Sequence, residues 1–520
     1  MAAAYFLITC ADINQNGGSF FKVSLHKACY YRWIIASRRY YRNKKREGMT
    51  SSREQFGSRI GFILAAAGSA VGIGNLVGFP VAATKNGGGA FLLIYAFFVA
   101  FVCLPVMVAE LSLGRNTQKD PIGAYRKQAG SDSLWQIAGL LAFITPFMIA
   151  VFYMVITVWI FGYFVEILSG NLDTLAQAET FGQFINSKVI FLYLVVVAGL
   201  LNVILLSGVK NGIERAAKIM MPALFIMLIG LVIFVLTLDN AWAGVRYYLI
   251  PDFSKIDAKV VNGALSQAFF SLSLGMGILI TYGSYVNQKE SITTSAKLIA
   301  LTDTAVAFCA GLLVLPAIFA LHPNTDTSQL SNSSVSMIFS FLPQIFLELQ
   351  TLIGYVGASA VAATFFLLVF FAAITSMVSI TEVPTSSLID SLQLPRKTAL
   401  IRLNVAMALF TIACAVSFGM VGWLSSFIEY ADTNKSFFDV VVDVFYETIL
   451  PLNGLLVCLF VRYRWKKGFN DEVETGDRHF KNSWTERYIN FSLATFIPLI
   501  LLVIFINTVA QKFFGAALFG

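Results

Sequence analysis

The feature that constrains this chain most is a series of long apolar runs. Examples are FLLIYAFFVAFVCLPVMVA at 91–109 and LATFIPLILLVIFINTVA at 493–510. A run of about 20 apolar residues crosses the roughly 30 Å hydrocarbon core of a membrane. Lipid offers no partner to free backbone groups, so such runs must be helical. A membrane β-barrel would alternate polar and apolar residues. The chain is therefore predicted to be an all-α polytopic membrane protein.

Composition agrees with this class. Of the 520 residues, 57% are hydrophobic and 13% are charged, whereas soluble proteins carry about 25% charged residues. We predict about eleven transmembrane helices, and the eighth is long enough to include a helical segment outside the membrane. They lie near 58–84, 88–114, 135–168, 188–207, 214–238, 262–286, 295–321, 346–392, 397–418, 437–461 and 486–511.

Lysine and arginine are unevenly distributed between the two sets of loops. The loops near 115–134, 208–218, 287–297, 391–402 and 462–487 hold 19 of them, and the opposite loops hold 7. Loops rich in positive charge face the cytoplasm. We expect a multi-pass protein of the cell (inner) membrane, with a cytoplasmic N-terminus and an external C-terminus. These loops explain the net charge of +8, which therefore indicates no nucleic-acid partner.

The first 48 residues differ from the rest. They contain the basic stretch RRYYRNKKREG and lack a long apolar run with a cleavage site, so a signal peptide is not predicted. We expect 1–48 to be a basic N-terminal extension that is disordered or lies upstream of the start codon in use. Contact with anionic lipid is an alternative for this segment.

One apolar run, AAAGSAVGIGNLVGFP at 65–80, carries four glycines and an asparagine. A dinucleotide-binding loop is excluded, because Val77 stands where a third glycine belongs and no βαβ unit surrounds it. The spacing of Gly68 and Gly72 could simply let two helices pack closely. A third possibility is a membrane helix that is interrupted at the glycines.

The second half of the chain favours the interrupted helix. The run FFSLSLGMGILITYGSY at 269–285 carries another G-x-G pair near its middle. Each of the two runs is followed by four more predicted spans, so the interruptions occupy corresponding places in two five-helix halves. Such a pair of interruptions points to the central binding site of a transporter. The broken ends expose amides and carbonyls that can bind anionic groups or cations.

Several motifs, in order along the chain, resemble those of the neurotransmitter:sodium symporter family, in particular its bacterial, LeuT-type amino-acid branch. The resemblance runs from about Arg53 to the end of the tenth span. Its motifs are SRIGFILAAAGSAVGIGN, NGGGAF, AELSLGR, NGIERAAKIMMP, FFSLSLGMGILITYGSY and FFAAITSMVSITEVP.

The resemblance implies a LeuT-type 5+5 inverted repeat in which helices 1 and 6 are broken. The transporter domain would cover 49–520, with repeats over 58–238 and 262–461 and an eleventh helix over 486–511. The chain would not be an enzyme and would need no organic cofactor. Its ligands would be two transported sodium ions and an amino acid, within a lipid bilayer, with no particular oligomeric state predicted.

The resemblance also implies two sodium sites. Sodium site 1 would use the Ala70 carbonyl and the side chains of Asn75, Ser271 and Asp303. Sodium site 2 would use the carbonyls and hydroxyls of Gly68, Val71, Ala372, Thr375 and Ser376. Neutral oxygens suit a hard monovalent cation. In the alternative for Thr375 and Ser376, the hydroxyls bond to their own helix.

Asp303 is an acid inside a predicted span, where a charge is costly and indicates function. It falls where many family members have asparagine, although a one-residue shift in the alignment would place Thr302 there. Chloride-dependent animal relatives supply the negative charge with a bound anion. The resemblance therefore implies that Asp303 makes chloride unnecessary.

The amino-acid site follows in the same way. Its carboxylate would meet the amides of Ile73 and Gly74 and the Tyr153 hydroxyl, and its amine would meet Ala70, Phe270, Ser271 and Ser273. Its side chain would lie against Ile149, Phe270, Met276, Ser376 and Ile380. No charged side chain belongs to this set, so a neutral amino acid is expected. Met276 can adapt to bulky apolar or aromatic groups.

The gates depart from the family pattern. Gly78 stands where most members have the arginine of the outer gate, and Asp439 and Asp443 are the acids that the tenth span offers. On the inner side, Arg53, Tyr285 and Asp390 resemble the closing network. Glu110 and Glu382 are predicted to accept hydrogen bonds from amides of the broken helices.

Together these features predict a sodium-coupled, chloride-independent symporter that imports a neutral, hydrophobic or aromatic amino acid by alternating access. The alternative is a membrane sensor or receptor on the same fold, which binds an amino acid and transports little. Gly78 is the feature that favours this alternative.

Overall fold

The computed structural model describes residues 53–130, 133–177, 179–321, 335 and 337–516. The chain divides into two compact units, Met1–Glu54 and Gln55–Gly520. Of the first unit only Arg53 and Glu54 are described, so the predicted extension over 1–48 lies outside the described residues. All helices and strands described below belong to the second unit.

The first half of this unit is a succession of helices that includes three short π-helical segments, η1, η2 and η3. Its elements are α3 (Arg59–Ala70), η1 (Gly74–Gly78), α4 (Phe79–Lys85), α5 (Gly89–Phe98), η2 (Val99–Cys103), α6 (Leu104–Thr117), α7 (Pro121–Ala129), α8 (Gln136–Leu168), α9 (Leu172–Leu175), α10 (Thr180–Ile185), α11 (Val189–Leu206), η3 (Val209–Glu214) and α12 (Arg215–Leu236).

The second half adds the only strands among the described residues, a two-stranded antiparallel hairpin that pairs Ile428 with Lys435. Its elements are α13 (Ala241–Leu249), η4 (Phe253–Lys255), α14 (Ala258–Ser271), α15 (Ile278–Gly283), α16 (Ile292–Leu321), η6 (Met337–Phe341), α18 (Leu342–Glu348), α19 (Gln350–Leu392), α20 (Arg396–Val416), α21 (Gly422–Ser425), β1 (Ile428–Tyr430), β2 (Thr433–Lys435), α22 (Phe437–Val441), η7 (Val442–Ile449), α23 (Leu450–Leu459), η8 (Phe460–Trp465), α24 (Lys467–Gly476), α25 (Trp484–Ala494) and α26 (Phe496–Phe514).

The helices confirm the predicted fold class. Within the described residues, nine helical segments are long and apolar enough to cross a membrane, and the pair Arg59–Ala70 and Gly74–Lys85, bent by 54°, makes a tenth. The span predicted at 262–286 corresponds to α14 and α15, of 14 and 6 residues, which are each too short to cross alone. The eighth predicted span starts later than expected, because α18 is separate and Gly354 (φ 75°) interrupts the beginning of α19.

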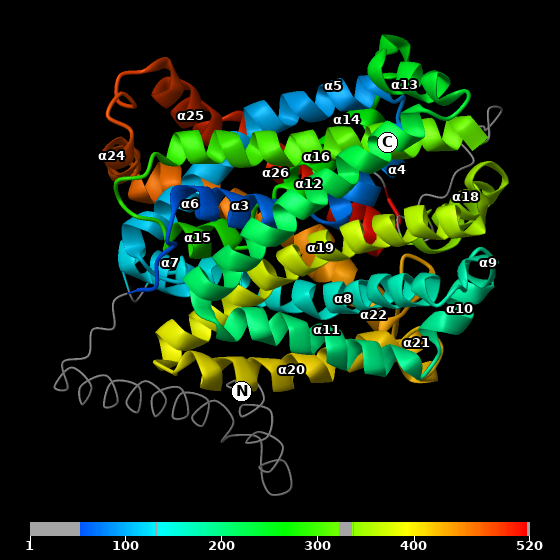
Figure 1. The fold of residues 1–520 in the computed structure, drawn as a ribbon. Helices are drawn as coiled ribbons and strands as arrows, with labels where there is room; N and C mark the ends of the chain where they lie inside the picture. The colour runs from blue at the N-terminus through cyan, green and yellow to red at the C-terminus, as the bar shows by residue number, and fades with distance from the viewer. Residues whose placement is uncertain (1–52, 131–132, 178, 322–334, 336, 517–520) are drawn as a thin grey trace, which may run out of the picture. The chain divides into compact units, whose positions relative to one another are not determined.

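The two halves pack reciprocally. Helices α5 and α6 of the first half contact α14 and α15, while α16 of the second half contacts α3 and α4. The third long helices of the halves, α8 and α19, lie along each other, and the fifth helix of each half, α12 or α23, packs on the third helix of the other. Figure 1 shows α3 and α15 between α16 and α19. This exchange of equivalent contacts is typical of an inverted repeat.

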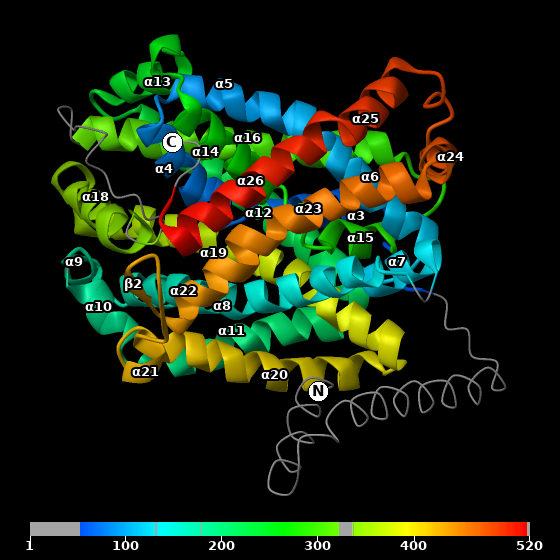
Figure 2. The same cartoon turned by 180° about the vertical axis from the view of Figure 1, so that it is seen from behind.

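The loops separate into two groups at opposite ends of the helices. Figures 1 and 2 show α7 and α24 at one end, and α9, α10, α13, α18 and α21 at the other. The first end contains the arginine- and lysine-rich segments 115–134 and 462–487, as the predicted topology requires. The assignment of this end to the cytoplasm stays a prediction.

The first break is stabilised by a side chain of its own segment. α3 ends at Ala70 because Val71 turns extended (φ −68°, ψ 104°). The Gly72 amide, which has lost its helical partner, donates to Asn75 Oδ1 at 3.0 Å. Helical structure resumes in η1, where the backbone amides of Asn75 and Leu76 donate to the Gly72 carbonyl.

The second break, at 272–277, uses positive φ angles at Ser273 (54°), Gly275 (77°) and Gly277 (69°). The Gly275 amide donates to Glu110 Oε1 on α6 at 2.8 Å, which confirms the role predicted for this acid. A Cβ atom added at Gly275 would lie 2.5 Å from the Leu450 carbonyl oxygen. Glycine is therefore required here both by conformation and by close packing.

We predict that Gly275→Ala destabilises the protein, because a non-glycine residue at positive φ costs roughly 1–2 kcal/mol before any clash. The thermal unfolding midpoint of the detergent-solubilised protein should fall. Gly199→Ala is the matched control, since Gly199 lies in α11 with nothing within 4 Å of an added Cβ. Equal midpoints for the two variants would contradict this account of the break.

Candidate functional site

The first break brings the predicted residues of sodium site 1 together. Asn75 Nδ2 donates to Asp303 Oδ1 at 2.7 Å and to Ser271 Oγ at 2.9 Å. Ser271 Oγ in turn lies 2.9 and 3.1 Å from the two carboxylate oxygens of Asp303. Residues from η1, α14 and α16 thus meet in one buried cluster. The Asn75 oxygen, the predicted ligand atom, accepts from Gly72 and keeps a second lone pair.

Asp303 is fully buried, and the partners that the structure gives its carboxylate are all neutral. Tyr95 on α5, which was not predicted, donates its hydroxyl to Asp303 Oδ2 and to Ser271 Oγ, both at 3.2 Å. None of the described ion pairs involves Asp303. These contacts belong to Asp303 and not to Thr302, which favours the ungapped alignment over the one-residue shift.

The residues predicted for sodium site 2 come from α3 and α19, which pack against each other. Ser376 Oγ donates to the Ser69 and Val71 carbonyls at 3.2 and 3.3 Å. Thr375 Oγ1 bonds to its own helix, at 3.0 Å from the Ala372 carbonyl, as the alternative described. An added Cβ at Gly68 would be 3.3 Å from Thr375 Cβ. The two helices are thus close enough for a shared ion, and the site stays a prediction.

The polar part of the predicted amino-acid site surrounds the same break. The Ile73 amide donates to Tyr153 Oη at 3.3 Å, so the amide and the hydroxyl expected to bind a carboxylate are neighbours. Gly74 is exposed although Ile73 and Asn75 are buried, and an added Cβ there would meet open space. Accessible space therefore borders the broken helix at Gly74. From the second break, Ser273 Oγ donates to the Ser69 carbonyl at 3.1 Å.

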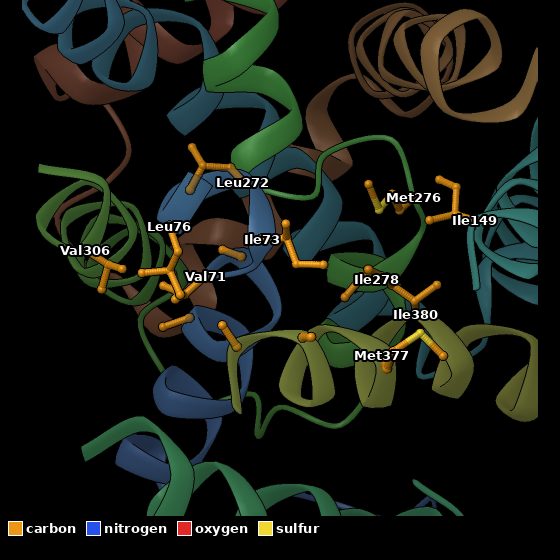
Figure 3. Packing of buried hydrophobic residues seen from close by; sticks show 14 of the residues in the cluster. Val71, Ile73, Leu76, Ile149, Leu272, Met276, Ile278, Val306, Met377 and Ile380 are labelled. Atoms are coloured by element: carbon orange, nitrogen blue, oxygen red, sulfur yellow. The ribbon is translucent and has the colours of Figure 1, made fainter. Parts of the chain in front are cut away.

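The apolar part of this site comes from three further segments. Ile149 on α8, Met276 in the second break and Ile380 on α19 are all buried in one hydrophobic cluster. Figure 3 shows these side chains gathered near Ile73. Phe270, at the end of α14, is partly buried and packs against the same hydrophobic cluster. The predicted pocket wall is thus apolar and flexible at Met276.

Comparison with known proteins identifies the family. A family model described as "Sodium:neurotransmitter symporter family" matches residues 53–183 and 182–515. The chain belongs to this family. It is therefore a membrane transporter and not an enzyme, and the family and its bacterial relatives are described as sodium-dependent.

Bacterial and animal relatives of this symporter differ in how much of the chain they match. An "Uncharacterized sodium-dependent transporter YhdH" of Bacillus subtilis is 34% identical over 463 residues, 88% of this chain and 97% of the relative. The "Sodium- and chloride-dependent taurine transporter" of Bos taurus is 26% identical over 57% of this chain and 55% of its own length. The crystal structure of MhsT in complex with L-phenylalanine superposes with a TM-score of 0.75, at 36% identity over 88% of this chain and 99% of MhsT.

In the last part of α19, Glu382, which was predicted to bond to backbone amides, forms an ion pair that the sequence did not predict. Arg396 binds Glu382 with two nitrogens, at 2.8 and 3.0 Å, and the Tyr285 hydroxyl donates to Glu382 Oε1 at 2.7 Å. Asp390 accepts from the Asp120 amide at 3.0 Å. Arg53 belongs to the other compact unit, so the gating role predicted for Arg53, Tyr285 and Asp390 stays a prediction.

The two acids predicted for the outer gate both have hydrogen-bonding or ionic partners in the structure. Asp439 forms a capping box with Ser436 at the start of α22. Asp443 pairs with Lys512 on α26, at 3.1 Å, and accepts from the Tyr430 hydroxyl at 2.7 Å. Burial and the Asp443 carboxylate raise the pKa of Tyr430, which keeps this hydroxyl a donor. Gly78, in η1, offers no side chain for either acid.

We predict that Arg396→Met destabilises the symporter, because it leaves the fully buried Glu382 without its cation. Breaking a buried ion pair costs roughly 3–5 kcal/mol. Thermal unfolding in detergent should show a clear fall in midpoint, whereas Lys397→Met, which removes an exposed neighbouring charge, should have little effect. Similar midpoints for both variants would count against a structural ion pair at this end.

Proposed function

We propose that this chain is a sodium-coupled symporter that imports a neutral, hydrophobic or aromatic amino acid without chloride, by alternating access. Two sodium ions and the amino acid would bind at the first break. The observation that carries the proposal is the buried Asp303 carboxylate, which lies next to Asn75 and Ser271 at this break.

The carboxylate supports a cation site. A buried charge is costly unless a counter-charge compensates it, and the described partners of Asp303 are neutral donors from Asn75, Ser271 and Tyr95. Sodium is a hard cation that prefers oxygen ligands, and this cluster supplies carboxylate, hydroxyl and amide oxygens. An ion here would add the Ala70 carbonyl and touch the amino-acid carboxylate.

The same carboxylate supports independence from chloride. The bovine taurine transporter is described as sodium- and chloride-dependent, and the Bacillus subtilis relative as sodium-dependent. In this chain the negative charge beside the predicted sodium is part of the protein. A fixed carboxylate needs no bound anion to balance the cation.

The pocket wall supports a neutral, apolar substrate. Ile149, Met276 and Ile380 are buried, with 1%, 4% and 3% exposed area, and they offer no charge to an acidic or basic side chain. MhsT, whose fold is similar, was solved with L-phenylalanine. A pocket of this kind suits aromatic and branched aliphatic amino acids best.

Shared contacts would couple the ions to the substrate. A sodium ion that touches the amino-acid carboxylate raises the affinity for the amino acid, and the amino acid raises the affinity for sodium. A potential of 100 mV is worth about 2.3 kcal/mol per charge, and a tenfold gradient about 1.4 kcal/mol. Two ions could therefore sustain an accumulation on the order of 10⁵-fold.

We predict sodium-driven uptake of phenylalanine into proteoliposomes that continues at an unchanged rate when chloride is replaced by gluconate. Asp303→Asn should lower uptake at least about tenfold in gluconate, because the fixed charge is lost, and chloride should restore part of it. Thr302→Val is the matched control. Binding of phenylalanine without accumulation by the wild-type chain would instead identify a sensor, and chloride-free uptake by Asp303→Asn at the wild-type rate would refute the role of this carboxylate.

We predict that a panel of the twenty amino acids, competing for sodium-dependent phenylalanine binding, ranks aromatic and large aliphatic amino acids first. Aspartate, glutamate, lysine and arginine should fail to compete, because the buried pocket offers no partner for their side-chain charge. Effective competition by a charged amino acid would exclude the pocket formed by Ile149, Met276 and Ile380.

A further inference from the structure

Two acidic residues of the tenth span share one cation on the eleventh. Lys512 Nζ on α26 lies 2.7 Å from Glu447 Oε2 and 3.1 Å from Asp443 Oδ1. Both acids belong to η7, the longest π-helical segment among the described residues. The Thr448 hydroxyl donates to the Asp443 carbonyl five residues earlier, at 2.7 Å, which matches the wider turn of a π-helix.

Lys512 is necessary for this arrangement on electrostatic grounds. Asp443 is almost fully buried, with 7% side-chain exposure, while Glu447 and Lys512 are exposed by 29% and 31%. Two like charges one helical turn apart repel each other, and a buried carboxylate without a counter-charge is costly. Without the ammonium group, η7 would have to change shape or move its carboxylates toward water.

Tyr446, one of the three residues between the two acids, contacts the predicted amino-acid site. Tyr446 stacks on Phe270, with ring centroids 4.8 Å apart and an interplanar angle of 29°. It also meets Phe152, the neighbour of Tyr153, edge to face at 5.7 Å. The tyrosine thus touches Phe270, a predicted residue of the apolar wall, and Phe152, the sequence neighbour of Tyr153.

This aromatic pair lies near the accessible space beside the first break. Gln267, three residues before Phe270 on α14, donates to the carbonyl of the exposed Gly74 at 3.0 Å. Gly78 provides no side chain that could fill this space. Phe270 and Tyr446 are both only partly buried, so part of each residue borders accessible space.

We propose that Lys512 is a positioning residue that holds Tyr446 against Phe270, beside the predicted amino-acid site, by pairing with Asp443 and Glu447. This inference rests on the proposed amino-acid site. It implies that α26 and η7 move together. It also implies that an aromatic stack helps to retain the substrate where the family's arginine is absent.

The test is equilibrium binding and dissociation of phenylalanine in saturating sodium, measured on the full chain in detergent. Tyr446→Ala should raise Kd and the dissociation rate about three- to tenfold, the range that aromatic stacking supports. Tyr446→Phe, which keeps the ring, should change Kd by less than about twofold. Lys512→Met should resemble Tyr446→Ala although its side chain does not contact the pair.

A charge swap distinguishes a positioning role of Lys512 from a general loss of stability in the variant. The double variant Glu447→Lys, Lys512→Glu keeps one cation among three charged groups and should bring the dissociation rate back toward the wild-type value. Lys188→Met, which removes an exposed lysine at the start of α11, is the matched control. Vmax of uptake should change less than KM in Lys512→Met, because the wall acts on substrate retention.

Two results would overturn the inference. One is a wild-type Kd and dissociation rate in both Tyr446→Ala and Lys512→Met. The other is a loss of affinity in Lys188→Met as large as that in Lys512→Met. Because the readout is binding, a wild-type chain that binds phenylalanine without accumulating it would refute symport while these variants still test the wall.

Discussion

The structure depends on how two broken helices satisfy their backbone groups where lipid offers no partner. A free amide in hydrocarbon costs several kcal/mol. The first break satisfies the Gly72 amide with the Asn75 side chain, and the second satisfies the Gly275 amide with Glu110 from α6. Both breaks therefore require buried polar side chains whether or not a ligand is bound. Oxygen atoms of such side chains are also suited to binding sodium.

The reciprocal packing of the halves explains why these polar groups meet. Each broken segment contacts the second helix of the other half, so Asp303 on α16 reaches the first break while Glu110 on α6 reaches the second. Each break is thus completed by an acid from the opposite half. The two acids serve different ends, because Glu110 bonds to a backbone amide and Asp303 bonds to side chains that can also bind a cation.

Local sequence was sufficient to predict the breaks and Asp303, because glycine pairs within apolar runs and a charge inside a span are unusual by themselves. The partners that lie far along the chain were not predictable from one sequence. Tyr95 is 208 residues from Asp303, and Lys512 lies just beyond the predicted eleventh span, 65 or more residues from the acids that it pairs with. Arg396 and Glu382 are close in sequence, yet nothing in their spacing showed that the turn after α19 brings them together.

The eleventh helix adds to this scheme a contact that the repeat does not contain. The two five-helix halves can exchange equivalent contacts, but α26 has no counterpart in the first half. Its ion pairs with Asp443 and Glu447 therefore have no equivalent in the first half, which would make the proposed wall of the site asymmetric. This asymmetry does not set the direction of transport, which depends on the sodium gradient and the membrane potential. It means that the two halves close against different partners, and Lys512 is the group that makes them differ.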